Sequence, residues 1–163
     1  MKLLSFTLKH ICAFLVFVSF GYSAAAQSKI NTMQTNKDLI QSYFKKWADG
    51  TGTVFEILDD NATWTISGTS PLSKTYTSKK QLIDEVINPL NTRLSQKIIP
   101  TIKNIYEDGN TVIVIWDGKA IAKDGQPYNV TYAWFMEIEN GKIIKVTAFL
   151  DTIDFSEIFS RIK

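Results

Sequence analysis

Two spacings of apolar residues divide this sequence into a helical half and a strand half. Apolar residues recur every three or four positions over 37–48 and again after Ser78, which predicts amphipathic helices there. A short helix over 53–58 and a strand over 62–67 are predicted between them. Apolar and polar residues then alternate in four runs, at 97–106, 111–122, 128–139 and 142–152. We therefore expect an α+β fold, with the helices packed on one face of a curved antiparallel sheet and a last helix over 155–162.

The last predicted hairpin gives a register. If Asn140-Gly141 is a two-residue turn, Glu139 pairs with Lys142 and the positions of every later pair sum to 281. One face would then carry the aromatic set Tyr128, Val130, Tyr132, Trp134, Met136 and Ile138, with Ile143, Thr147 and Phe149. The other would carry Ala133 and Phe135 with Ile144, Val146, Ala148 and Leu150. Because both faces are apolar, we expect a homodimer through the aromatic face and a cavity under the helices on the other.

The first residues indicate export. Lys2 and Lys9 precede an apolar run over 11–20, and three alanines end at Ala26, which is the pattern of a cleaved signal peptide over 1–26. We expect a flexible lead-in over 27–35, a single domain over 36–163, and a periplasmic or secreted protein. No second long apolar run follows, so we expect no membrane insertion after cleavage.

Composition narrows the function classes. Cleavage after Ala26 leaves 18 − 2 = 16 Lys and Arg against 16 Asp and Glu, which argues against nucleic acid as a partner. It also removes the one cysteine, Cys12, and the one histidine, His10. A Ser-His-Asp triad, a thiol nucleophile and the usual zinc sites are thereby excluded, and we expect no metal and no cofactor. Any acid-base chemistry falls to Asp, Glu, Tyr or Lys.

Three residues are candidates for such chemistry. Asp117 lies within a strand between Trp116 and Gly118, where burial beside an indole would raise its pKa; alternatively it points to solvent. Asp151 ends the last strand and either reaches the mouth of a pocket or caps the final helix. Tyr43 falls on the buried stripe of the first helix, where its hydroxyl needs a partner.

The aromatic content favours an apolar ligand site. Four tryptophans in a small domain suit either a pocket for a hydrophobic molecule or a tight core. The residues expected to line such a pocket are Trp47, Trp64, Trp116, Ala133, Phe135 and Ala148.

The order of elements, together with four segments, resembles the SnoaL-like branch of the NTF2-like superfamily. These segments are "YFKKWADG", "DDNATWTISGTSPLSKTY", "WDGKAIAKDGQPYNVTYAW" and "NGKIIKVTAFLDT". The superfamily includes ketosteroid isomerase, polyketide cyclases and limonene-epoxide hydrolase. The resemblance implies a cone-shaped α+β fold over nearly the whole of 36–162, but this fold also serves as a plain binding module.

Comparison with ketosteroid isomerase leaves the function open. That enzyme uses an Asp base and an oxyanion hole of a Tyr and a protonated Asp. Tyr43 matches the Tyr, whereas Thr65 or Ile66 and Ala133 stand where the two acids belong. The resemblance therefore implies an exported protein that binds a small hydrophobic molecule, with isomerase- or cyclase-type proton transfer by Asp117 or Asp151, or else a non-catalytic binding or interaction module.

Overall fold

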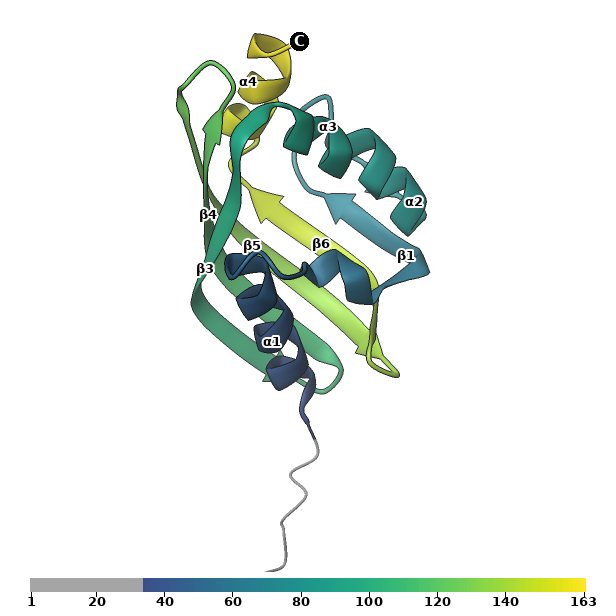
Figure 1. Cartoon of the computed structure of the whole chain (residues 1–163). Helices are drawn as coiled ribbons and strands as arrows, with labels where there is room; N and C mark the ends of the chain where they lie inside the picture. The colour runs from purple at the N-terminus through teal and green to yellow at the C-terminus, as the bar shows by residue number, and fades with distance from the viewer. Residues whose placement is uncertain (1–33) are drawn as a thin grey trace, which may run out of the picture. The chain divides into compact units, whose positions relative to one another are not determined.

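The computed structural model describes residues 34–163 and confirms the α+β fold (Figure 1). The predicted signal peptide and residues 27–33 of the lead-in lie outside the described residues. The sheet has six strands in the order β2-β1-β6-β5-β4-β3. Their bounds are β1 (Leu58–Ile66), β2 (Thr75–Tyr76), β3 (Leu94–Asp108), β4 (Thr111–Ala122), β5 (Pro127–Glu139) and β6 (Lys142–Leu150).

The helices lie against one face of this sheet, as Figure 1 shows. They are α1 (Asn36–Ala48), the 3-10 turn η1 (Val54–Ile57), α2 (Lys79–Leu82), the π turn η2 (Ile83–Ile87), α3 (Asn88–Thr92) and α4 (Thr152–Arg161). No helix within 34–163 is both long and apolar enough to cross a membrane.

Helix α1 begins at Asn36, one residue earlier than predicted. Thr35, rather than Asn36, is the N-cap, and it forms a capping box with Asp38 that satisfies backbone N–H groups of the first turn. The stripe predicted from the sequence faces the sheet, with Ile40 and Phe44 fully buried. Helix α1 packs mainly on β3.

The helical segment after Ser78 contains a wide turn just before Pro89. In η2 the Asn88 N–H donates to the carbonyl of Ile83, five residues back. Pro89 follows and has no N–H to donate. The irregular turn therefore lies where a regular helix would also lack one backbone hydrogen bond.

The predicted register of the last hairpin is wrong beyond its first two pairs. Glu139 pairs with Lys142 and Ile138 with Ile143, but Glu137 then pairs with Lys145, so Ile144 is an extra residue on β6. Because side chains alternate along a strand, this one-residue bulge moves every later side chain of β6 to the opposite face. Trp134 thus pairs with Ala148, and Ala133 with Phe149.

The helices cover the face opposite to the one expected. The aromatic set of β5, from Tyr128 to Ile138, is buried on the helix side together with Val146 and Ala148. Ala133, Phe135 and Phe149 lie on the outer face instead, and Phe135 and Phe149 are 39% and 49% exposed. The face expected to form a dimer is therefore the core, and the face expected to line the cavity is the outside.

Strand β1 joins the sheet through the end of the chain. It pairs in parallel with β6, Trp64 opposite Val146 and Ile66 opposite Ala148, and its other neighbour is the two-residue strand β2. The sheet is therefore not a simple antiparallel meander, because its first strand is added beside its last.

Candidate functional site

A cavity of about 690 Å³ lies between the helices and the sheet. Its floor comes from the inner faces of β1, β4, β5 and β6, one side wall from β3, and the opposite wall from α2, η2 and α3. The end of α1 and the start of α4 close two further sides. This volume falls within the range of small-molecule sites, which is roughly 300–1,000 Å³.

The floor of the cavity is aromatic. All four indoles line it, and each is in contact with at least one other: the ring centroids of Trp116 and Trp134 are 4.7 Å apart, and those of Trp64 and Trp134 are 4.9 Å apart. Trp47 reaches the same group from α1, with its centroid 5.2 Å from that of Trp116. The predicted ligand-lining residues Trp47, Trp64, Trp116 and Ala148 are therefore brought together, and they leave the cavity open rather than filling it.

Tyr132 continues this floor. It is the cross-strand partner of Trp116, and the two rings are stacked with centroids 4.1 Å apart and an angle of 8° between their planes. Gly118, two residues along β4, leaves room for this stack. A Cβ atom on Gly118 would lie 3.0 Å from Trp116 and 3.1 Å from Tyr132. Gly118 thus marks a close approach of side chains.

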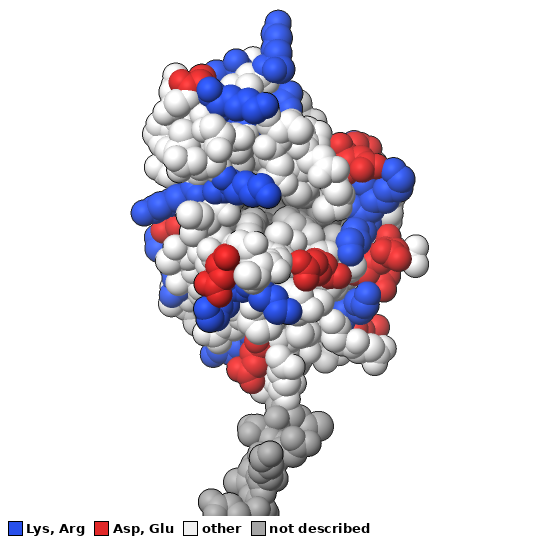
Figure 2. All heavy atoms as spheres, in the orientation of Figure 1, with Lys and Arg blue, Asp and Glu red and all other residues white. Residues whose placement is uncertain are grey.

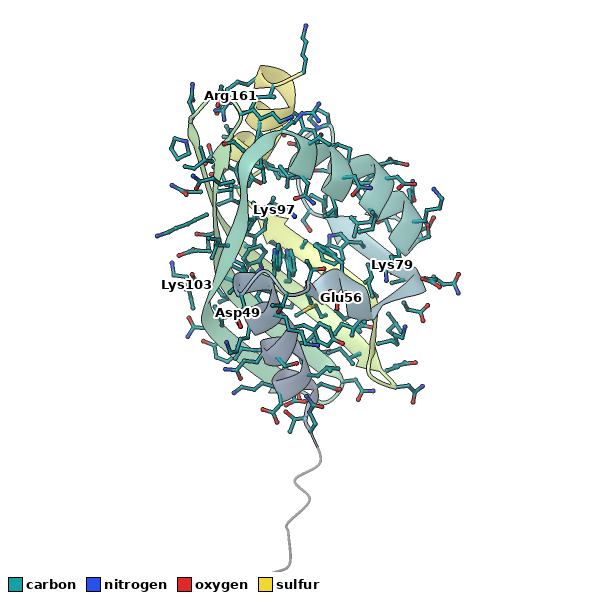
Figure 3. The ribbon with its side chains drawn as sticks, viewed as in Figure 1. Asp49, Glu56, Lys79, Lys97, Lys103 and Arg161 are labelled. Atoms are coloured by element: carbon teal, nitrogen blue, oxygen red, sulfur yellow. The ribbon has the colours of Figure 1, made fainter. Side chains whose placement is uncertain are left out.

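The polar side chains of the cavity lie mostly at its edge. Among the residues that line it, the ionisable ones are Asp49, Lys97 and Tyr132. Asp49, at the end of α1, pairs with Lys45 at 2.6 Å. Figure 3 shows Asp49 and Lys97 as side chains of α1 and β3, and both residues are exposed. In Figure 2 the charged side chains lie around a recessed, mostly uncharged centre of this face.

Asp117 is not part of this site. It lies on the outer face of β4, opposite in orientation to Trp116, and its carboxylate accepts a hydrogen bond of 2.6 Å from the Thr131 hydroxyl. The Lys103 ammonium lies 3.3 Å away. The Thr131 hydrogen bond, supported by Lys103, lowers the pKa of Asp117. Of the two alternatives for Asp117, the structure agrees with the one in which it points to solvent, because the indole beside it in sequence points to the other face.

Asp151 and Tyr43 also lie away from the cavity wall. Asp151 is the N-cap of α4, and its Oδ1 accepts a hydrogen bond from the backbone N–H of Ile153 at 2.9 Å. The ring of Tyr43 is partly buried on α1, and the Lys46 ammonium lies 4.0 Å from its centroid. Among the described residues, Asp117, Asp151 and Tyr43 neither meet one another nor line the cavity.

Ala133 and Phe135 are likewise misplaced by the sequence prediction. They alternate along β5 with the buried Trp134 and so lie on the outer face, whereas the bulge at Ile144 moves Ala148 to the side of Trp134. Sequence reasoning also missed Tyr132, Lys97 and Asp49 as lining residues. The alternation of β5 did place Tyr132 on the same face as Trp134, but that face was assigned to a dimer.

Helix α4 closes one end of the cavity. Phe155 from its first turns lines the wall, and the helix is tied to the β4–β5 hairpin by Arg161. The Arg161 Nε lies 2.8 Å from Oδ2 of Asp124, as an ion pair whose N–H is not aimed at that oxygen, and another guanidinium N–H donates to Gln126 at 3.0 Å. Within 34–163 no group of His, Cys, Asp and Glu side chains could hold a metal ion.

Comparison with known proteins gives a family and a fold. The model of the SnoaL-like domain matches residues 40–146. No curated protein sequence matches this chain significantly. Among solved structures, an NTF2-like protein from Burkholderia thailandensis is similar at 17% identity with a TM-score of 0.63, over 77% of this chain and 98% of that one.

Two further structures have the same fold. Bal32a, from a soil-derived mobile gene cassette, is 17% identical with a TM-score of 0.63, over 76% of this chain and 95% of that one. TerC, co-crystallised with polyporic acid, is 17% identical with a TM-score of 0.61, over 77% of this chain and 98% of that one. At this identity the likeness concerns the fold alone.

Proposed function

The chain belongs to the SnoaL-like domain family, and on that basis we propose that it binds a small hydrophobic molecule in the cavity beneath its helices. The observation that carries this proposal is the aromatic floor, where four indoles border about 690 Å³ of unfilled space. An empty space of this kind is unfavourable, because the side chains that line it lack dispersion contacts on one side. A hydrophobic ligand would restore them. The structural relative co-crystallised with polyporic acid supports small-molecule binding as the function to test.

The geometry best supports binding of a ligand without acid-base chemistry by Asp117, Asp151 or Tyr43. The carboxylates of Asp117 and Asp151 lie outside the cavity, and the carboxylate at its edge, Asp49, is paired with Lys45. We therefore propose a binding protein, exported through its first 26 residues, in preference to an isomerase or a cyclase.

The bulge at Ile144 provides a matched pair of variants for the test. Ala148 lies on the cavity floor, whereas Ala133 lies on the outer face of the adjacent strand. Ala148→Leu would place three further carbon atoms at the floor of the binding space, whereas Ala133→Leu would leave that space unchanged. Naphthalene is a suitable probe, because its binding can be followed through the fluorescence of the four indoles.

We expect the unaltered protein and Ala133→Leu to bind naphthalene alike, and Ala148→Leu to bind about tenfold more weakly. Circular dichroism would show that each variant is folded. Native mass spectrometry of the protein purified from its own host would reveal a co-purified ligand. If naphthalene leaves the fluorescence of the unaltered protein unchanged and no ligand co-purifies, the proposed function is wrong.

A further inference from the structure

Two tyrosine hydroxyls meet on the inner face of β5, next to the cavity. The hydroxyl oxygens of Tyr128 and Tyr132 are 2.9 Å apart, and both side chains are buried, with exposed fractions of 3% and 6%. Residues four apart on a strand lie on the same face, which explains why the two meet. Of the two, Tyr132 is the one that lines the cavity.

The hydrogen bond within the pair leaves one hydroxyl proton without an acceptor. Each hydroxyl carries one proton, and the hydrogen bond between them uses only one of the two. Within 34–163 neither hydroxyl has any other hydrogen-bond partner. Asp154 is close enough to act electrostatically on Tyr128 but makes no hydrogen bond to it. One O–H of the pair is therefore left without an acceptor from the described residues, and a buried polar group in that state is destabilising.

A second donor in the same wall has no acceptor either. Trp116, stacked on Tyr132, is 1% exposed, and its Nε1–H has no partner among the described residues. An indole nitrogen can only donate, so it cannot satisfy the free tyrosine proton. The surroundings are thus rich in donors and poor in acceptors.

Both tyrosines remain protonated and so act as donors. Burial raises the pKa of Tyr132 well above its ordinary value, and burial likewise raises that of Tyr128. A neutral acceptor suits such a pair, because burying an unpaired carboxylate costs far more than burying a carbonyl. The cation that lines the cavity, Lys97, is exposed and so remains in contact with solvent.

We propose that the ligand of this cavity carries a neutral acceptor oxygen, as in an aromatic ketone or a quinone, which accepts a hydrogen bond from Tyr132 while Tyr128 donates to Tyr132. This inference rests on the proposed function, since it specifies the chemistry of the molecule that the cavity takes. The apolar part of such a ligand lies against the indoles, and its oxygen lies at the tyrosine pair.

Two probes of nearly equal shape test the proposal. Naphthalene has no acceptor oxygen, whereas 2-acetylnaphthalene adds a ketone to the same ring system. Their affinities would be measured from the indole fluorescence in the unaltered protein, in Tyr132→Phe and in Tyr106→Phe. Tyr106 is 53% exposed on β3 and is the matched control, because it loses the same hydroxyl outside the cavity.

We expect the unaltered protein and Tyr106→Phe to prefer the ketone, and Tyr132→Phe to bind the ketone roughly five- to tenfold more weakly with naphthalene binding unchanged. The infrared carbonyl band of bound 2-acetylnaphthalene should lie at lower frequency than in an alkane solvent and should move back towards that value in Tyr132→Phe. This band reports the hydrogen bond directly, which a merely structural role of Tyr132 would not affect.

Several results would overturn the inference. Equal binding of the two probes by the unaltered protein would show that the free proton is satisfied otherwise, for example by water. An equal loss of both probes in Tyr132→Phe would show that the hydroxyl only supports the fold. In both cases naphthalene still binds the unaltered protein, so the proposed function stands. Failure of both probes to bind would instead remove the proposed function, and this inference with it.

Discussion

Asp117 shows how much a single residue's chemistry depends on the face to which it points. Its sequence neighbours, an indole and a glycine, left open whether it is buried or points to solvent, and alternation along β4 places it beside Thr131 and Lys103 on the outer face. Its folded pKa is lowered, so its contribution to stability is present above the unfolded pKa of about 3.9 and is lost as the pH falls through the folded value.

We therefore predict that Thr131→Val raises the pKa of Asp117 and destabilises the protein at pH 7. The loss should shrink as the pH falls below the ordinary Asp range, because the carboxyl group is then neutral in the folded and unfolded states alike. NMR titration of the Asp117 carboxyl carbon would measure its pKa. Urea unfolding at pH 7 and at a pH below the ordinary Asp range would measure the change in stability.

Thr147→Val is the control for this experiment. Thr147 lies on the same outer face, opposite Phe135, and its hydroxyl makes no hydrogen bond to a carboxylate in the described part of the chain. It should leave the Asp117 titration unchanged. An unchanged titration in Thr131→Val as well would mean that Lys103, and not the hydroxyl, controls this carboxylate.

At the scale of elements, Arg161 joins helix α4 to the β4–β5 hairpin through its contacts with Asp124 and Gln126. Its guanidinium pairs with Asp124 of the β4–β5 hairpin and with Glu157 of its own helix, at 2.8 and 3.5 Å. Since Phe155 of the same helix lines the cavity, the Arg161 contacts also hold one end of the cavity closed.

We predict that Arg161→Gln speeds amide hydrogen exchange in 152–161 by roughly three- to tenfold, because local opening follows the stability of the local contacts. Release of bound naphthalene should also become faster. Hydrogen-exchange mass spectrometry and stopped-flow fluorescence would measure the two rates. Lys123→Ala, which removes a neighbouring charge of the hairpin, should change neither, and equal effects of the two variants would contradict the assignment.

The elements themselves could largely be predicted from the sequence, because each is set by local spacing and turn chemistry. The capped helix α1, the four long strands and the turn at Asn140 follow from such local signals. The direction in which the side chains of β6 point, relative to those of β5, could not be predicted in the same way. It depends on Ile144, a single extra residue with no glycine or proline to mark it.

A weaker signal of the bulge is present in the sequence. Ile143 and Ile144 are two adjacent apolar residues within an alternating run, and Val146, Ala148 and Leu150 resume the alternation one step later. If this one-residue shift in the alternation is interpreted as a bulge, Ala148 is placed on the same face as Trp134. The same interpretation would also have placed Tyr132 on the face that lines the cavity. Tyr132 was missed, and Ala133 and Phe135 were misplaced, through the assignment of the sheet faces and not through composition.

At the scale of the whole molecule, the outer face of the sheet carries apolar side chains that no helix within 34–163 covers. Phe135 and Phe149 lie together there with ring centroids 5.8 Å apart, and Tyr106 and Ile113 extend the same face across β3 and β4. Exposed apolar patches of this kind commonly mark contacts between proteins. The homodimer thus stays a prediction, now assigned to this face instead of the aromatic set of β5.

We expect light scattering after size exclusion to give the mass of a dimer, and Phe149→Asp to give that of a monomer, because a carboxylate would be buried unpaired at the contact. Ile153→Asp is the control. Ile153 is 77% exposed on α4, away from the sheet, and its replacement should leave the mass unchanged. A monomeric unaltered protein at micromolar concentration would contradict the prediction.

The parallel pairing of β1 with β6 also has a consequence for the timing of folding. Strand β1 is complete by Ile66, yet its long partner is the last strand of the chain, so β1 remains largely unpaired until residues 142–150 have been made. Pairings between such distant segments form late, because a long loop must close before they bring any stabilisation. The sheet of such a chain cannot be completed until its last strand has been made, and this late completion would suit a protein exported through a signal over 1–26.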